Sequence, residues 1–364
     1  MDVRQGVYTI PSGTGFLKAL AKGLLAMGDG RTEGLAEMRV LLPTRRAGRE
    51  LREAFLSLSV GKPLLLPRIQ PIGDIDAEEV ELLLSGLSGI GDDIPPAITS
   101  LERQFLLAAL IQKKDTSLGL DAALVLAADL ARLIDTVHTE DMDFSRLANI
   151  VPDALSEHWR QTLDFLDIVT EHWPLILASR GQIDPADRRN RLLKAQARLW
   201  REHPPQTPVI AAGSTGSIPS SGELLAVISR LPKGCVILPG LDLGLENISW
   251  ENITDTHPQC TMRNLLRRME IERQQVRLWP ESADLASPRT ALLRAVMRPT
   301  ETFAADNESI SDSALSGLSL LEASNPREEA AVIALTLREV MEQEGRTACL
   351  VTPDRTLARR VMTA

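Results

Sequence analysis

Two segments near the N-terminus have the pattern of a buried strand followed by a tight turn and a helix. The first is Gly6 to Ala19 (GVYTIPSGTGFLKA), and the second is Arg39 to Phe55 (RVLLPTRRAGRELREAF). Val40, Leu41 and Leu42 form a continuous apolar run, which is typical of strands buried on both faces of a parallel sheet. Repetition of this unit constrains the chain to an α/β fold with helices packed on a parallel sheet.

The turn in the first segment has the outline of a phosphate-binding loop but lacks its chemistry. Such a loop follows G-x-x-x-x-G-K-[S/T], in which Lys reaches the phosphates and Ser or Thr holds magnesium. With Gly15 at the second glycine, the first glycine is missing, Phe16 stands at the lysine position and Leu17 stands at the hydroxyl position. A plain strand-to-helix turn therefore explains the segment better than ATP hydrolysis, and we expect no tight ATP binding. The degenerate nucleotide loop comprises Gly13, Thr14, Gly15, Phe16 and Leu17.

Length, cysteine content and net charge limit the domain count, the compartment and the class of protein. A chain of 364 residues with 44% hydrophobic content predicts two or three domains. The three cysteines are far apart in the sequence, which argues against a metal site or a disulfide framework and favours a reducing cytoplasm. No signal peptide and no run of about eighteen apolar residues is present, so no membrane segment is expected. The net charge of −9 excludes a uniformly basic nucleic-acid binder but allows local basic surface.

One arginine cluster gains support from its place after the second predicted strand. Thr44 is the predicted N-cap of a helix that opens with Arg45 and Arg46. Free backbone N–H groups at a helix start, together with two arginines, can bind a DNA phosphate. Thr44, Arg45 and Arg46 are therefore DNA-binding candidates.

A segment near the C-terminus repeats this pattern. ACLVTPDRTLARRV predicts a strand from Ala348 to Val351, an N-cap at Thr352 and a helix that carries Arg355 and Arg359. A further predicted strand (LSLLE) and a helix capped by Asn325 precede it. This recurrence predicts a second α/β unit, with Thr352, Arg355 and Arg359 as its DNA-binding candidates.

Between these units the chain is predicted to be almost entirely helical, from Thr99 to about His203. Leu120–Val137 and His158–Leu177 carry apolar residues at helical spacing. A capping box begins at Thr99, and Asp184 is the expected N-cap of another helix. We interpret this block as a helical insertion. Its tryptophans are expected in the core: Trp159, Trp173 and Trp200.

Sheet-like sequence returns after the insertion. Pro208–Ala212 and Cys235–Leu238 are predicted buried strands, separated by a turn and an amphipathic helix. An ATP-driven motor would place Asp-Glu at one of these strand ends to bind magnesium and the attacking water. The first strand instead leads into Gly213, and Asp242 after the second is either a substitute or an ordinary turn residue. A second catalytic element is therefore missing.

The order of these segments resembles the early motifs of superfamily 1 DNA helicases. More specifically, the chain resembles the N-terminal part of the AddB family, the double-strand-break repair subunits of AddAB helicase-nucleases, in its alphaproteobacterial form. The stretches that carry this resemblance are YTIPSGTGFLKALAKGL, EHWRQTLDFLDIVTEHWPLILASRGQIDPADRRNRLL, THPQCTMRNLLRRM and TPDRTLARRV. The resemblance implies a helicase-like fold, an AddA partner and a contribution to Chi recognition. It also implies a C-terminal nuclease domain with an iron–sulfur cluster, whose ligands lie outside these residues.

The resulting fold class is α/β, with a RecA-like parallel-sheet helicase domain, a large helical insertion and the start of a second RecA-like domain. We expect a discontinuous first domain at 1–80 and 206–300, the insertion at 81–205 and the second domain at 314–364. One strand–helix–strand–helix pass gives the second sheet too few strands, so we expect the chain to be part of a longer protein.

The expected function is a non-hydrolysing helicase-like subunit of a cytoplasmic, nucleoid-associated repair complex. It would bind single- and double-stranded DNA and scaffold an AddA-like partner, with no cofactor in these residues and no activity alone. Two alternatives stay open. One is an ATP-dependent helicase with a degenerate phosphate loop. The other is a structural adaptor without DNA contact, which the acidic net charge favours.

Overall fold

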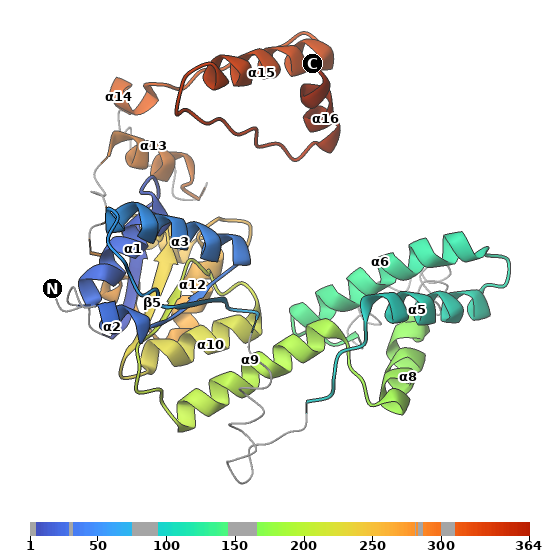
Figure 1. Ribbon diagram of the computed structural model, residues 1–364. Helices are drawn as coiled ribbons and strands as arrows, with labels where there is room; N and C mark the ends of the chain where they lie inside the picture. Colours follow the sequence, from blue (N-terminus) through green and yellow to red (C-terminus); the bar gives the residue numbers. More distant parts are fainter. Residues whose placement is uncertain are drawn as a thin grey trace. The chain divides into compact units, whose positions relative to one another are not determined.

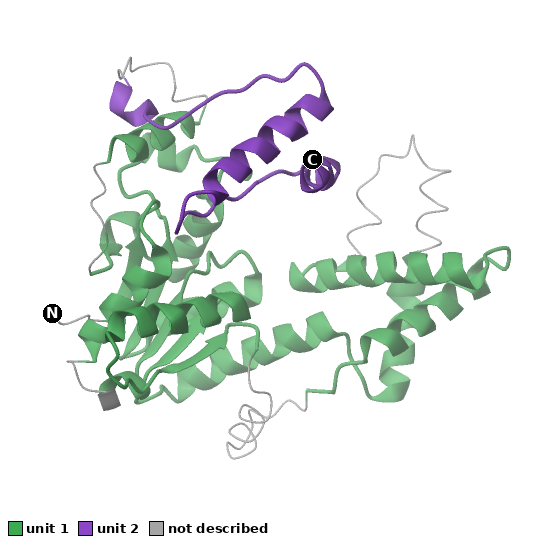
Figure 2. Ribbon diagram, turned by 45° about the horizontal axis from the view of Figure 1, so that its top comes forward, with its two compact units in different colours: residues 1–308 green, residues 309–364 purple. Residues whose placement is uncertain are grey.

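In the computed structural model of the protein, the described residues are 5–28, 32–74, 94–144, 166–280, 282, 287–299 and 310–364. The chain divides into two compact units, residues 1–308 and 309–364 (Figure 2). The boundaries predicted inside the first unit, near residues 80 and 205, stay predictions.

The first unit contains a six-stranded, all-parallel sheet in the order β3-β2-β4-β5-β1-β6. Its strands are β1 (Gly6–Ile10), β2 (Arg39–Leu42), β3 (Arg68–Pro71), β4 (Val209–Ala212), β5 (Gly234–Pro239) and β6 (Arg277–Leu278). The predictions of β1, β2, β4 and β5 are confirmed, whereas β3 and β6 were not predicted. Since all strands are parallel, the loops that follow them meet at one edge.

Side chains of the strands alternate between two cores, one on each face of the sheet. Tyr8 and Ile10 contribute to one core and Val7 to the other. The first core is covered by α1 (Phe16–Met27), α2 (Thr32–Ala36) and α3 (Arg45–Ser59). The second is covered by α9 (Pro185–Glu202), α10 (Pro219–Arg230), α11 (Asn247–Glu251) and α12 (Cys260–Met269) (Figure 1). Burial on both faces explains why the inner strands β2, β4 and β5 are mostly apolar.

The position of α1 on the sheet is fixed by Trp279, which follows β6. Its indole is 1% exposed and donates from Nε1 to the carbonyl oxygen of Ala19 at 3.0 Å. A β-carbon added to Gly23 would lie 2.3 Å from that nitrogen, so the absence of a side chain at Gly23 allows this close approach.

The described part of the predicted insertion has its own apolar core. This core is formed by side chains of α5 (Ser100–Lys114), α6 (Leu120–Thr139), the π-helix η3 (Ile168–His172) and α8 (Trp173–Arg180). The helix predicted at Leu120–Val137 is confirmed by α6. The first part of His158–Leu177 and Trp159 lie outside the described residues, and the remainder forms η3 and the start of α8. Trp173 and Trp200 are buried, as predicted.

The predicted caps of the insertion are formed, with different side-chain roles. Thr99 accepts a hydrogen bond from the backbone of Glu102, but the Glu102 carboxylate pairs with Arg180 and does not complete the capping box. Asp184 is the N-cap of α9, yet its side chain makes no capping bond. Its buried carboxylate instead pairs with Arg103, at 2.9 Å, and accepts from Trp173 Nε1, at 3.0 Å. These contacts join α9 to α5 and α8, while the rest of α9 packs against the sheet core.

The second unit lacks the strands that were predicted for it. It contains α14 (Asp312–Leu315), α15 (Pro326–Met341) and α16 (Arg355–Thr363), and Asn325 caps α15 as predicted. The strands predicted at LSLLE and at Ala348–Val351 are wrong, because neither segment forms a strand. Leu320 and Val351 are 86% and 89% exposed. An apolar run becomes a strand only when neighbouring backbone satisfies its N–H and C=O groups. The described residues of this unit therefore contain no second RecA-like sheet.

Among the described helices, none combines the length and the apolar character that crossing a membrane requires.

Candidate functional site at the carboxyl edge of the sheet

The loops after β1, β2, β4 and β5 lie at the carboxyl edge, where parallel α/β sheets bind their ligands. The predicted degenerate nucleotide loop and the first group of DNA-binding candidates both lie at this edge. Of the second group, Arg355 and Arg359 lie on α16 and Thr352 lies just before it, all in the other compact unit.

The loop after β1 closes as a tight turn. The N–H of Thr14 donates to the carbonyl oxygen of Pro11 at 3.3 Å, and Gly13 has a φ of +86°, which favours glycine. Gly15 is the N-cap of α1 and offers no side-chain cap. The predicted strand–loop–helix junction is therefore confirmed in its backbone.

Phe16 occupies the end of this loop with an apolar ring. It packs, with Leu17, against the core that α1 and α3 share. A β-carbon added to Gly213, directly after β4, would lie 3.3 Å from Phe16 Cε1 and 3.5 Å from Pro43 Cδ. The residue at the lysine position thus lies at the end of β4, where a motor would carry its magnesium-binding carboxylate. Lys18 is exposed on α1.

The junction after β2 has the predicted capped helix. Thr44 Oγ1 accepts from the N–H of Ala47 at 3.1 Å, so the N–H groups of Arg45 and Arg46 stay uncapped by this side chain. Arg45 pairs with Asp74 at 2.6 Å, and the hydrogen bond and negative charge of Asp74 raise the pKa of Arg45.

Both predicted arginines of this junction are exposed. Arg46 pairs with Glu50 at 3.0 Å, and the side chains of Arg45 and Arg46 are 84% and 87% exposed. Exposed ion pairs contribute little to stability because water screens them, so a phosphate can replace these carboxylates. Arg49, also exposed, makes no ion pair within the described part of the chain.

The α16 junction corrects the predicted cap. Thr352 is not the N-cap; its hydroxyl accepts from the N–H of Asp354 at 3.1 Å, outside the helix. Asp354 caps α16 by accepting from the N–H of Thr356 at 2.7 Å. A carboxylate next to the first turn is favoured by the free N–H groups and by the helix dipole. Arg355 and Arg359 are exposed on α16, as expected.

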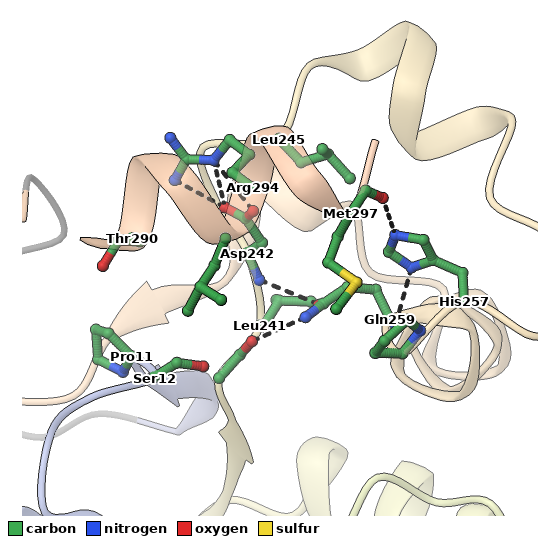
Figure 3. Close-up of a pocket in the computed structure, with 13 residues that line it drawn as sticks. Pro11, Ser12, Leu241, Asp242, Leu245, His257, Gln259, Thr290, Arg294 and Met297 are labelled. Atoms are coloured by element: carbon green, nitrogen blue, oxygen red, sulfur yellow. Dashed lines mark hydrogen bonds and ion pairs between the residues drawn. The ribbon is translucent and has the colours of Figure 1, made fainter. Parts of the chain in front are cut away.

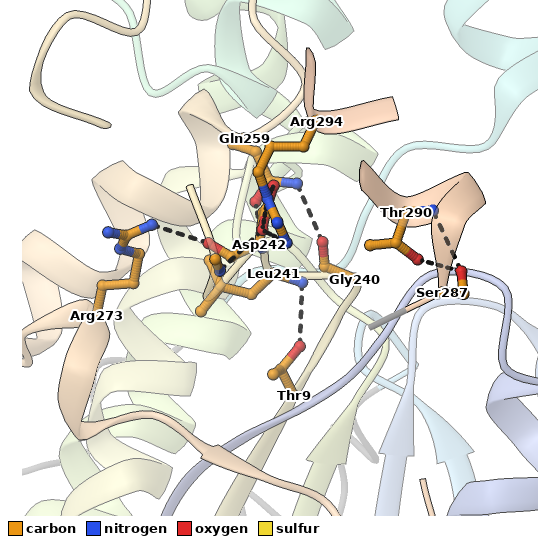
Figure 4. A network of polar contacts seen from close by, with 10 residues as sticks. Thr9, Gly240, Leu241, Asp242, Gln259, Arg273, Ser287, Thr290 and Arg294 are labelled. Carbon is orange, nitrogen blue, oxygen red and sulfur yellow. Dashed lines mark hydrogen bonds and ion pairs between the residues drawn. The ribbon is translucent and has the colours of Figure 1, made fainter. Parts of the chain in front are cut away.

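Asp242, after β5, is held at every backbone polar atom and at its carboxylate (Figure 4). Gln259 Oε1 accepts from its N–H at 3.1 Å, and Arg273 Nη1 donates to its carbonyl oxygen at 3.0 Å. Its Oδ1 accepts from the N–H of Gly244 at 2.9 Å and lies 2.9 Å from Arg294 Nη2. Asp242 is therefore a turn residue, and Arg294 neutralises its charge. For this reason Asp242 is a poor substitute for a carboxylate that binds magnesium.

A pocket of about 190 Å³ lies beside this turn (Figure 3). It is lined by Pro11, Ser12, Gly240, Leu241, Asp242, Leu245, His257, Pro258, Gln259, Thr290, Leu293, Arg294 and Met297. The last four come from α13 (Pro288–Val296) and the residue after it. His257 accepts from the N–H of Gln259 at Nδ1, at 3.0 Å, and donates from Nε2 to the carbonyl oxygen of Met297, at 2.7 Å. His257 and Arg294 thereby hold α13 over the pocket.

Sequence reasoning missed the partners that build this turn. The sequence marks Asp242 as a possible carboxylate at a strand end. Its partners Gln259, Arg273 and Arg294 follow it by 17, 31 and 52 residues in the chain. No local pattern marks such pairs, because each arginine is equally compatible with a solvated helix face.

Among the described residues, no three His, Cys, Asp or Glu side chains gather as a metal ion would require. No protein-family model matches this chain, and no curated protein matches it.

Proposed function

We propose that this chain is the helicase-like part of an AddB-type subunit of a double-strand-break repair complex. In this role it binds DNA and scaffolds an AddA-like motor in the cytoplasm, at the nucleoid, and it hydrolyses no ATP itself.

The observation that carries the proposal is the position of Phe16. A motor needs a lysine on the nucleotide phosphates and a carboxylate on magnesium, and it needs both at this edge of the sheet. Here an apolar ring takes the first position and packs beside Gly213, at the second. This contact supports loss of the ATP-facing chemistry at both positions together.

Support for DNA binding comes from the junction after β2. Arg45 and Arg46 present exposed guanidinium groups beside free N–H groups at the start of α3, and Arg49 extends the positive charge by one turn. Arginine at a helix N-terminus is a common arrangement for binding a phosphate.

The DNA role is tested by fluorescence anisotropy of a labelled single strand at several salt concentrations. The parent chain is compared with Arg45→Ala/Arg46→Ala and with Arg355→Ala/Arg359→Ala. Each phosphate contact that is lost is expected to lower the salt slope of log K by about 0.7.

The control is Arg201→Ala/Arg230→Ala, which removes the same charge from two arginines that are also exposed and ion-paired. Its binding is expected to equal that of the parent. If the variant combining all four candidate substitutions binds as the parent does at every salt concentration, the DNA role is abandoned and the structural adaptor is favoured.

The ATP side is tested by phosphate release from ATP in the presence of DNA and a partner whose own motor is inactivated. No release is expected from this chain. DNA-stimulated release under these conditions would overturn the non-hydrolysing role.

A further inference from the structure

We infer that the pocket beside Asp242 binds a small, uncharged, mostly apolar molecule of the size of one or two rings. This inference is independent of the proposed DNA role, because none of the DNA-binding candidates lines the pocket.

The place of the pocket favours a ligand. It lies where the loops after β1 and β5, neighbouring strands of the sheet, leave the carboxyl edge. Pro11 and Ser12 come from the first loop, and Leu241 comes from the second (Figure 3). Open parallel sheets bind small molecules at this edge, in apolar cavities with a few fixed polar groups.

The size of the pocket limits the ligand. Its volume of about 190 Å³ is below the range of roughly 300–1,000 Å³ that is usual for drug-sized ligands. One ring or two fused rings fit this space, whereas a nucleotide with its phosphates does not.

The charge of the ligand is limited by the pairs already formed in the wall. Asp242 and Arg294 neutralise each other at 2.9 Å, with side chains only 19% and 23% exposed. The ring of His257 uses both nitrogens, and Gln259 uses its carbonyl oxygen on Asp242 and its amide on Gly240. A charged ligand would have to lose its hydration without gaining an unpaired partner of opposite charge.

The walls favour an apolar ligand with one polar atom. Leu241, Leu245, Leu293 and Met297 supply apolar surface. The hydroxyl of Ser12 has no hydrogen-bond partner among the described residues, and it lies so close to Gly240 that a β-carbon there would be 2.5 Å from it. Ser12 is exposed, and its Oγ is available to one nitrogen or oxygen of a ligand.

The test uses the intact chain and ligand-observed NMR titrations with indole, adenine, benzamide and benzoate. Saturable binding is expected for the three neutral probes. Benzoate, the anionic counterpart of benzamide, is expected to bind at least about tenfold more weakly, which corresponds to about 1.4 kcal/mol. Equal binding of benzoate and benzamide, or no saturable binding of any neutral probe, would overturn the inference.

Variants place the binding in this pocket. Leu293→Trp and Met297→Trp fill it from two positions that are already 47% and 45% exposed, so the fold is expected to tolerate both. Each is expected to weaken indole binding by at least about tenfold. Leu175→Trp, on the 71% exposed Leu175 of α8, is the matched control and is expected to bind as the parent does.

Ser12→Ala is expected to weaken the binding of adenine by roughly two- to tenfold, which is the effect of losing one hydrogen bond. Unchanged binding by both filling variants, with circular dichroism equal to that of the parent, would contradict the site.

Discussion

The junction after β2 and the segment from Ala348 to Arg360 have nearly the same local pattern and fold differently. Each has an apolar run, then threonine and proline, then a helix rich in arginine. In the first, the apolar run is a strand and threonine caps the helix. In the second, the apolar run forms no strand, and Asp354 caps the helix. The comparison teaches that a capped helix follows from local sequence, whereas a strand follows from its neighbours.

The neighbours of β2 explain the difference. It pairs with β3 on one side and β4 on the other, and Val40 and Leu42 are 0% and 1% exposed. Val351, at the equivalent place, is 89% exposed and belongs to no strand of the described residues. The same apolar character therefore leads to a buried strand in one unit and to exposed backbone in the other.

The largest expected difference is in hydrogen exchange. Amides of Arg39–Leu42 are expected to exchange more than about a thousandfold more slowly than those of Ala348–Val351, because opening β2 requires disrupting the sheet. Exchange measured by mass spectrometry on the whole chain checks this. Equal protection of the two segments would show that residues 348–351 are paired in solution and would remove the contrast.

Truncation of the two apolar runs gives the next effect. Leu42→Ala is expected to destabilise the first unit by about 2–5 kcal/mol, because it leaves a cavity in a close-packed core. Val351→Ala is expected to change stability by no more than about 0.5 kcal/mol. Urea unfolding followed by tryptophan fluorescence measures the first unit, since all five tryptophans lie within residues 1–308.

For Val351→Ala, loss of the protection of the α16 amides against hydrogen exchange in a urea titration is the appropriate measurement. A loss comparable to that of Leu42→Ala would mean that Val351 is buried in solution.

The two threonines should differ in their effect on helix starts. Thr44→Ala is expected to cost about 1 kcal/mol, because it removes the hydrogen bond to Ala47. Thr352→Ala is expected to leave the helicity of α16 nearly unchanged, whereas Asp354→Ala lowers it. Chemical shifts of the first-turn amides provide the measurement. If Thr352→Ala melts the first turn of α16 and Asp354→Ala does not, the cap is misassigned.

The smallest effect is a pH dependence confined to α16. Hydrogen bonds from the backbone of Thr356 and Leu357 lower the pKa of Asp354 from its ordinary value of 3.8. Since the pKa is depressed in the folded state, the contribution of the cap is complete above 3.8 and is lost as the pH falls through the lower folded value. The Thr356 amide shift should therefore titrate below pH 3.8, while that of Ala47, capped by a hydroxyl, should stay constant. A midpoint above 3.8 would contradict the cap.

Much of the central sheet was predictable because its inner strands are apolar on both faces. β3 and β6 were not, and both lie at the edges of the sheet. β3 is Arg-Ile-Gln-Pro, and β6 has only two residues, both exposed. An edge strand is half-solvated and has no apolar run to mark it, so only its pairing with a neighbour defines it.

The local features of the candidate site were predictable from the sequence, whereas its long-range contacts were not. Phe16 at the lysine position and Thr44 as a cap follow from spacing along the chain. The contact between Phe16 and Gly213 does not, because it joins loops nearly two hundred residues apart. The ion pair of Asp242 with Arg294 depends in the same way on where α13 packs.

The sequence by itself determined the helix starts, the apolar strands and the missing lysine and carboxylate, since these depend on residues a few positions apart. Tertiary structure alone decided which apolar runs became strands, which arginines formed ion pairs with carboxylates and where a pocket formed. The physical reason is that a hydrogen-bonded ladder, an ion pair and a cavity wall each require groups from distant parts of the chain, and packing of the cores sets their distances.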